Sequence, residues 1–313
     1  MKTILCYGWY NHGNLGDELF KEAFAHLFPN YNFIYTDHFN LENIEKADAV
    51  FFGGGSFLDQ EVFIPKDREV VWSNLLNKTI LYIGVGIETD FHKDHAELFT
   101  RASLIAPRTK NNRFHSGIYP ILEIPDLVYS LKNLRSKQKQ NTNFRSVLVL
   151  PNALVVPNHA DPHWMHSAWD HFKTEFSQFL DYLIDTKYQI DFGNFCFDDK
   201  FHDNFATYSI ISSMKNRSVK IIKQFTTGYE FSDYGTIITQ RYHGKVLADM
   251  ANVPCLSISH HDKLKSNNSI SYYELSKNKL IEEFHNLRTV PTESKIKYYL
   301  FEHLVQKVND ILK

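Results

Sequence analysis

Cysteine is scarce in this chain of 313 residues, with only Cys6, Cys196 and Cys255. The three are far apart, their number is odd, and no Cys-x-x-Cys pair occurs, which excludes a disulfide framework and a thiolate metal motif. Cys6 and Cys255 fall in strand-like runs, where a small buried thiol is expected. This usage predicts a reducing, cytoplasmic setting.

Long apolar runs and an excess of one charge are also lacking. No run approaches the roughly 20 apolar residues that a membrane helix needs, and the chain begins with one lysine and a short strand, which does not resemble a signal peptide. The net charge is −2, which gives no support for a nucleic-acid partner. With 43% hydrophobic and 22% charged residues, the composition is that of a globular protein long enough for two domains.

Apolar strand-like runs alternate with amphipathic helical patterns along most of the chain. This alternation predicts an α/β protein with doubly wound parallel sheets. The expected strands are residues 3–7, 32–35, 49–52, 79–86, 103–107, 119–124, 147–151, 188–192, 219–222, 235–239 and 254–258. The expected helices are residues 17–28, 68–77, 164–185, 201–214, 245–251 and 294–312.

A change of composition divides the pattern in two. Residues 131–146 are rich in Lys, Arg, Gln, Asn and Ser and have no acidic residue, which favours a solvated linker over a basic glycan-binding patch. The predicted domains are therefore residues 1–130 and 147–290, joined by this linker, and residues 291–313 form a C-terminal helix.

Two glycine-rich turns follow predicted strands. In residues 8–18 the glycines are spaced too widely for a dinucleotide fingerprint. Asp17 and Glu18 either favour the helix N-terminus that follows or orient a sugar hydroxyl; they disfavour a phosphate beside them. After the strand at 49–52, Gly54 and Gly55 permit close approach of a ligand, and a plain flexible turn is the alternative.

The stretch 239–244, with sequence TQRYHG, lies where a strand ends and a helix begins. Ligands bind at the carboxyl ends of parallel strands, and a helix N-terminus there attracts anions. Arg241 adds a fixed charge, His243 a mobile proton, and Gly244 a close backbone approach. A tight-turn glycine beside a structural histidine is the alternative. Arg108 follows another strand, where it serves either as a ligand residue or in a surface ion pair.

Residues 159–166 hold four potential metal ligands in eight positions. Their spacing matches no metal motif, and no metal site is predicted. The loop is instead expected to contact an acceptor sugar through His159. After the last predicted strand, Lys263 is placed to reach an anion.

Taken together, these motifs resemble those of the polysaccharide pyruvyl transferase family. The resemblance covers residues 3 to about 265 and rests on the opening 8–18, the glycines 53–55, Pro107-Arg108, Pro125-Asp126 and residues 240–244. It implies two Rossmann-like domains arranged as in GT-B glycosyltransferases, with the active site in the cleft. It also implies phosphoenolpyruvate as donor and co-substrate, with no other cofactor, and a saccharide or glycan as acceptor.

The expected reaction joins the donor to two sugar hydroxyls as a pyruvate ketal and releases phosphate. His243 is the predicted general acid or phosphate ligand, Asp17 orients or deprotonates the acceptor, and Arg241 anchors the donor. The full donor set is Arg108, Arg241, His243, Gly244, Lys263, Gly54 and Gly55. The full acceptor set is Asn14, Asp17, Glu18 and His159.

Two other functions stay open at this point. A nucleotide-sugar glycosyltransferase on the same architecture would need a base pocket, which the sequence does not identify. A non-catalytic glycan-binding protein would have the same fold without the chemistry, although the arginine and histidine are both present. The acceptor sugar and the formation of a homo-oligomer are also open.

Overall fold

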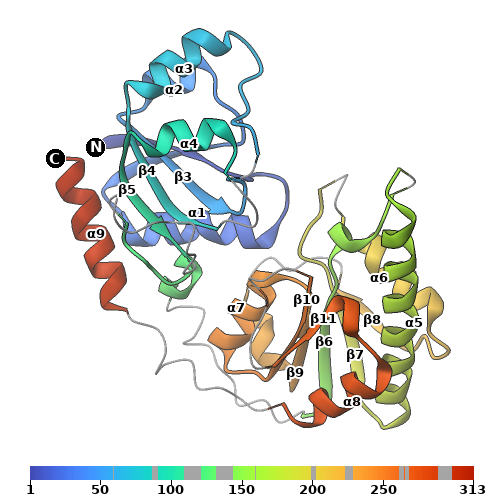
Figure 1. The fold of residues 1–313 in the computed structure, drawn as a ribbon. Helices are drawn as coiled ribbons and strands as arrows, with labels where there is room; N and C mark the ends of the chain where they lie inside the picture. Colours follow the sequence, from blue (N-terminus) through green and yellow to red (C-terminus); the bar gives the residue numbers. More distant parts are fainter. Residues whose placement is uncertain are drawn as a thin grey trace. The chain divides into compact units, whose positions relative to one another are not determined.

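The computed structural model describes residues 1–58, 60–86, 91–108, 121–131, 144–158, 160–198, 202–222, 228–260, 264, 268–287 and 298–313. The chain divides into two compact units. Unit 1 comprises Met1–His12, Gly16–Leu131 and Ser294–Lys313, and unit 2 comprises Gly13–Leu15 and Lys132–Glu293. Each unit has one parallel sheet covered by helices (Figure 1), which confirms the predicted fold class.

Unit 1 has a five-stranded parallel sheet in the order β2-β1-β3-β4-β5. The strands are β1 (Lys2–Tyr7), β2 (Tyr31–Thr36), β3 (Ala49–Gly55), β4 (Thr79–Val85) and β5 (Ala102–Pro107). The central strands β3 and β4 are apolar runs buried on both faces, as parallel strands under helices must be, whereas the edge strand β2 is mostly only partly buried. The carboxyl ends of β1 and β3 are adjacent in this order, which brings their glycine-rich turns together.

Helices cover both faces of this sheet. Successive strand residues point to opposite sides: Phe52 packs on Tyr82 within the core shared with α2 (Leu41–Lys46), α3 (Arg68–Leu76) and α4 (Lys93–Phe99). Phe51 instead meets Phe24 and Phe28 of the α1 side (α1, Leu15–Leu27). The C-terminal helix α9 (Tyr299–Ile311) also belongs to unit 1, where Tyr31 donates a hydrogen bond to Asn309 (2.8 Å).

One buried histidine lies in this core. His95 of α4 is fully buried, and its Nδ1 lies 3.0 Å from the hydroxyl of Tyr82. Its ring packs edge-on against Phe52. Burial lowers the pKa of His95 from 6.5 to about 4, because the charged imidazolium is poorly solvated in the core.

Acid is therefore expected to destabilise the protein. The unfolded chain binds a proton at His95 near pH 6.5, whereas the folded chain does so only near pH 4. The contribution of neutral His95 to the free energy of unfolding is therefore complete above pH 6.5 and is lost as the pH falls from 6.5 towards 4. Between pH 7 and 5.5 the loss from this residue is about 1 kcal/mol. Urea denaturation at the two pH values measures it. The same pH dependence in His95→Gln would contradict the assignment.

Unit 2 has a six-stranded parallel sheet in the order β11-β10-β9-β6-β7-β8. The strands are β6 (Ser146–Leu150), β7 (Gln189–Gly193), β8 (Lys220–Ile222), β9 (Thr236–Thr239), β10 (Cys255–Ser259) and β11 (Ser269–Ser271). The helices are α5 (His163–Asp185), α6 (Asn204–Ser213), α7 (Tyr242–Ala251) and α8 (Lys277–His285). The apolar stripe of α5 packs with α6, α8 and the sheet in one core, and α7 lies beside β9 and β10 (Figure 1).

Short elements account for most differences from the expected pattern. Helices α2, α4 and α8 and strand β11 were not predicted, because six to nine residues of helix or three of strand carry too little periodicity. Of the strand predicted at 119–124, the described part runs beside β5 through a parallel bridge from Ile121 to Ile105 and two backbone hydrogen bonds, but it forms no regular strand. Pro125 follows directly and has no N–H to extend a ladder.

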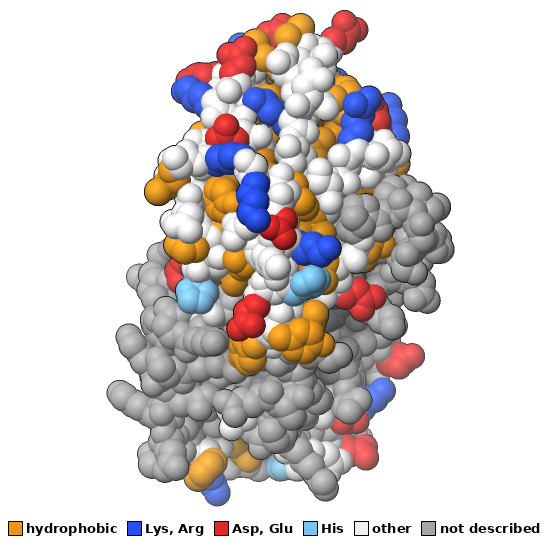
Figure 2. Space-filling model, turned by 90° about the vertical axis from the view of Figure 1, so that its left-hand side faces the viewer, with side chains coloured by type: hydrophobic (Ala, Val, Ile, Leu, Met, Phe, Trp, Pro, Cys, Tyr) orange, Lys and Arg blue, Asp and Glu red, His pale blue; other side chains and the backbone are white. Residues whose placement is uncertain are grey.

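The charged side chains on the surface and the apolar character of the helices both bear on what the composition predicts. On the described part of the face shown in Figure 2, acidic and basic side chains are interspersed and neither sign gathers into a patch. Among the helices of the described residues, none combines the length and the apolar character that crossing a membrane requires.

Candidate functional site

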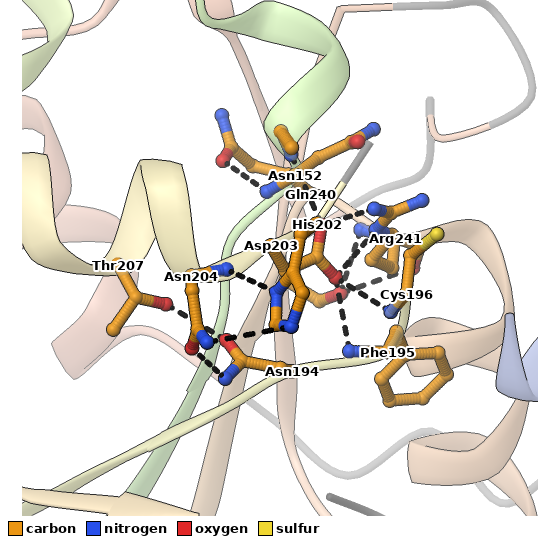
Figure 3. Close-up of polar contacts among 12 residues, drawn as sticks. Asn152, Asn194, Phe195, Cys196, His202, Asp203, Asn204, Thr207, Gln240 and Arg241 are labelled. Atoms are coloured by element: carbon orange, nitrogen blue, oxygen red, sulfur yellow. Dashed lines mark hydrogen bonds and ion pairs between the residues drawn. The ribbon is translucent and has the colours of Figure 1, made fainter. Parts of the chain in front are cut away.

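The carboxyl ends of β6, β7 and β9 in unit 2 meet around one buried ion pair, Asp203 with Arg241. Arg241 follows β9, and Asp203 directly precedes α6. Nε of Arg241 donates to Oδ2 of Asp203 (3.2 Å), and Nη2 donates to Oδ1. Figure 3 shows the carboxylate facing the guanidinium, with the loop after β7 beside it.

Asp203 is fully buried and is saturated with donors. Its Oδ2 accepts the backbone N–H groups of Phe195 (2.9 Å) and Cys196 (3.0 Å), and its Oδ1 accepts that of Ala153 (3.0 Å). A buried carboxylate is costly unless it is paired and hydrogen-bonded in this way. Asp203 therefore ties the loops after β6 and β7 to the arginine that follows β9.

The backbone on both sides of Arg241 is equally constrained. The hydroxyl of Thr239 accepts the N–H of Arg241 (2.9 Å) and donates to its carbonyl (3.0 Å). Helix α7 then begins at Tyr242, so His243 and Gly244 lie in its first turn, where N–H groups lack intrahelical acceptors. His243 is 9% exposed, and its ring packs edge-on against that of Tyr242.

Gly244 has a packing reason as well as its predicted ligand role. A Cβ at this position would lie 2.4 Å from Oγ1 of Thr239 and 2.8 Å from Cδ1 of Leu150. Only glycine lets the first turn of α7 approach the ends of β6 and β9 this closely. The close helix–strand contact that Gly244 permits accounts for the glycine without a ligand.

Beside the ion pair, Gln240 and Asn152 form a second polar contact. Oε1 of Gln240 accepts the N–H of Asn152 (3.1 Å), whose side chain lies 3.3 Å from Nε2 of His260. Gln240 is 3% exposed, and its Nε2 has no hydrogen-bond acceptor among the described residues. A buried donor of this kind costs free energy unless water or a ligand satisfies it.

Unit 1 carries a similar arrangement around Arg108, which follows β5. Nη1 of Arg108 donates to Asp126 (3.2 Å), and Nη2 donates to the hydroxyl of Ser56 (3.0 Å). The guanidinium lies over the ring of Phe20, 5.8 Å from its centroid. Asp126 is buried and also caps the turn that follows, accepting the N–H of Val128 (3.0 Å). Arg108 is thus a buried, carboxylate-paired arginine at a strand end, rather than a surface residue.

The predicted glycine turn lies beside Arg108. Gly54 and Gly55 have φ values of 73° and 132°, which side-chain-bearing residues rarely adopt. The ring of Tyr10 fills the space over Gly54, and its hydroxyl donates to the carbonyl of Gly53 (2.7 Å). Asp17 is buried, and its Oδ1 lies 3.6 Å from where a Cβ of Gly55 would be. The turn, Asp17 and Ser56 therefore share one end of the unit 1 sheet.

Other predicted residues have different surroundings. Oε1 of Glu18 accepts the N–H of Asn11 (2.8 Å) and its Oε2 pairs with Lys21, so Glu18 holds the preceding loop in place. Asn14 belongs to unit 2. Its neighbours are hydrogen-bonded to the loop after β7: the carbonyl of Gly13 accepts from the N–H of Phe197 (3.2 Å), and the N–H of Leu15 donates to the carbonyl of Phe195 (2.8 Å). His159 and Lys263 lie outside the described residues.

Sequence reasoning missed the partners of both arginines. Asp203 and Ser56 had no assigned role, and Asp126 entered only as part of a motif. One signal was available: a buried arginine requires a carboxylate, and each unit has an aspartate just before a helix. Among the described residues, no three His, Cys, Asp or Glu side chains gather as metal ligands would.

Solved structures with the same architecture place this fold in the GT-B class of glycosyltransferases and epimerases. The UDP-GlcNAc 2-epimerase of Methanocaldococcus jannaschii, in complex with UDP-GlcNAc and UDP, has a TM-score of 0.59 and 13% identity and covers 99% of both chains. The S. aureus MnaA–UDP structure has a TM-score of 0.59 and 12% identity, covering 99% of this chain and 96% of that one. MurG of Acinetobacter baumannii has a TM-score of 0.51 and 12% identity, covering 98% and 99%. At these identities the likeness shows the fold alone.

The sequence profile of the polysaccharide pyruvyl transferases matches residues 14–262. The chain belongs to this family. The comparison with curated proteins found no match. Family membership confirms the resemblance noted from the motifs and supports a transferase role in saccharide pyruvylation.

Proposed function

We propose that this protein transfers the enolpyruvyl group of phosphoenolpyruvate to two hydroxyls of a saccharide, forming a cyclic pyruvate ketal and releasing phosphate. The observation that carries the proposal is the buried Arg241, held by Asp203 at the N-terminus of α7 with His243 in the first helical turn. Family membership supports the pyruvyl group and the saccharide. Phosphoenolpyruvate as the donor is what the resemblance to this family implies, and the chemistry of the buried arginines is compatible with it.

Arg241 is suited to one anionic group of the donor. Asp203 engages Nε and Nη2, and within the described part of the chain Nη1 makes no hydrogen bond. The guanidinium is therefore fixed in orientation, with one donor nitrogen that none of the described residues engages. The first turn of α7 adds N–H groups and the positive end of the helix dipole. Arg108 of unit 1, which is likewise buried and paired with a carboxylate, stays a predicted donor-binding residue.

The reaction balances with His243 as the proton carrier. A proton adds to the methylene carbon of phosphoenolpyruvate, the C=C bond becomes a C–C bond, and C2 gains oxocarbenium character. One sugar hydroxyl attacks C2, and a second displaces phosphate, so two C–O bonds form and one C–O bond to phosphate breaks. Of the two hydroxyl protons, one replaces the proton spent on the methyl group and the other leaves with phosphate. His243 is proposed to deliver one of them, and Asp17 to orient the acceptor.

Binding of phosphoenolpyruvate tests the donor directly. The ligand is expected to raise the melting temperature of the wild-type protein as its concentration exceeds Kd. In Arg241→Lys the positive charge remains, but the two-nitrogen contact with Asp203 is lost. About ten times more phosphoenolpyruvate should then be needed for the same rise in melting temperature. Each variant is compared with its own ligand-free melting temperature.

Arg217→Lys is the matched control, because Arg217 is an exposed arginine of the same unit whose side chain donates to the backbone carbonyl of Ser212 (3.1 Å). It should keep the full response to phosphoenolpyruvate. UDP-GlcNAc serves as the competing ligand. Stabilisation by the nucleotide sugar, with none by phosphoenolpyruvate, would replace the proposal with glycosyl transfer.

A further inference from the structure

A cluster in unit 1, outside the residues considered above, combines charged and aromatic side chains at the carboxyl ends of β1 and β2. Asp37 follows β2, and the imidazole rings of two histidines lie within hydrogen-bond distance of its carboxylate. Nε2 of His12 lies 2.9 Å from its Oδ2, and Nδ1 of His38 lies 2.8 Å from its Oδ1. Partial burial would raise the pKa of Asp37, but the hydrogen bonds from His38 and His12 outweigh it and lower that pKa. The carboxylate is therefore ionised near neutral pH.

Two exposed aromatic rings flank this cluster. The indole of Trp9 stacks on the imidazole of His12, with centroids 4.0 Å apart and planes 18° apart. The ring of Phe63 lies edge-on to His38, 6.4 Å away. Trp9 is 37% exposed and Phe63 57%. A single exposed aromatic needs no explanation, but two rings on either side of a hydrogen-bonded carboxylate form a surface that is both apolar and polar.

The loop that carries Trp9 is held in position from both sides. Asn11 adopts a left-handed conformation, with φ 66°. Its N–H donates to Glu18 (2.8 Å), and its side-chain oxygen accepts from Lys21 (2.9 Å). Tyr10 is buried and bonded to Gly53 (2.7 Å). Trp9 and His12 are therefore fixed where they stand, which lowers the entropy lost when they bind a ligand.

The segment that carries Phe63 is also anchored. Its N–H donates to the hydroxyl of Tyr7 (3.0 Å), and its carbonyl accepts from the N–H of Phe39 (2.9 Å). Tyr7 ends β1, and Phe39 follows β2 closely. The two aromatic rings and the carboxylate thus come from three segments that are hydrogen-bonded to one another at the carboxyl end of the sheet.

We infer that Trp9, His12, Asp37, His38 and Phe63 form the surface that binds the acceptor saccharide. The apolar C–H face of a pyranose packs against an aromatic ring, and its hydroxyls need polar partners at the rim. Each carboxylate oxygen of Asp37 can accept from an imidazole and from a sugar hydroxyl as well. An ionised carboxylate at the centre of this surface disfavours an anionic group directly beside it. Only the identification of this saccharide as the acceptor rests on the proposed function.

Saturation-transfer NMR on the full chain tests the inference, with methyl glycosides of galactose, glucose, mannose and N-acetylmannosamine as probes. At least one glycoside should bind, and Trp9→Ala and Phe63→Ala should each weaken it by about tenfold. Asp37→Asn should weaken it by a similar factor. Tyr299→Ala, which removes an exposed aromatic ring at the start of α9, is the matched control and should bind as the wild type does.

The same variants are titrated with phosphoenolpyruvate in thermal-shift experiments. Trp9→Ala and Phe63→Ala should keep the wild-type shift, which also shows that they fold. Glycoside binding that is absent from the wild type, or unchanged in all three cluster variants, would overturn the inference and leave the donor assignment standing. Glycoside binding that depends on Trp9, in a protein that ignores phosphoenolpyruvate, would instead retain this surface and remove the proposed function.

Discussion

Replacement of His243 by alanine is expected to lower the rate of phosphate release from phosphoenolpyruvate and acceptor by about 10²- to 10⁴-fold, the usual contribution of a positioned general acid. His243 lies in the first turn of α7, two residues beyond the arginine that Asp203 holds. His243 is 9% exposed, which limits exchange of its proton with bulk water. A turnover within a few-fold of the wild type would remove His243 from the mechanism.

The kinetic pattern of this variant also separates the two roles of the histidine. A general acid acts in the transition state, so kcat should fall while the thermal shift caused by phosphoenolpyruvate remains. A phosphate ligand would instead lose that shift, with KM raised. His303→Ala, which removes an exposed imidazole from α9, is the control for losing a helical histidine outside the site.

The arrangement of strands and long helices was predictable because its causes are local. Apolar runs such as residues 49–52 and the stripe along α5 have the periodicity of their element, and the structure places β3 and α5 there. The glycine requirement at 54 and 55 was also readable, and their φ values confirm it. Domain boundaries that depend on tertiary contacts were harder to predict from the sequence. The membership of α9 in unit 1 depends on bonds such as that from Tyr31 to Asn309, and no local pattern announces them.

The candidate site was only half visible in the sequence for the same reason. Arg241, His243 and Gly244 adjoin one another in the chain and could be recognised as a group. Asp203 is 38 residues from Arg241 and 50 from Ala153, and its neighbours look like an ordinary helix start. The surface around Asp37 draws on three separate segments, and each contributes one or two unremarkable residues. Strand order decides which residues from distant parts of the chain lie together, and local sequence patterns do not predict strand order.

The second large effect is expected from Asp203→Asn, which should destabilise the protein by about 3–5 kcal/mol, the usual loss when one partner of a buried ion pair is removed. The hydrogen-bond pattern explains why asparagine does not suffice. Oδ2 accepts from Phe195, Cys196 and Arg241, and Oδ1 accepts from Ala153 and again from Arg241. Whichever way the amide turns, its NH₂ group faces N–H donors, and the buried guanidinium loses its counter-charge.

Asp181→Asn is the matched control for this substitution. Asp181 is a buried carboxylate of the same unit that accepts two backbone N–H groups, from Lys215 (3.0 Å) and Asn216 (2.9 Å). Its replacement should cost about 1–2 kcal/mol, as for the loss of backbone hydrogen bonds, and should leave the phosphoenolpyruvate response intact. Urea denaturation gives the two stability losses.

Asp203 is also expected to act on the donor through Arg241, and a double-mutant cycle distinguishes this from a stability effect alone. If the carboxylate only supports the fold, the losses of phosphoenolpyruvate affinity in Asp203→Asn and Arg241→Lys should add in the double variant. If the carboxylate orients the guanidinium, the second substitution should cost little once the first is made, because both destroy the same fixed fork. Additive losses would confine Asp203 to folding, whereas a coupling of about tenfold would make it the positioning residue of the donor site.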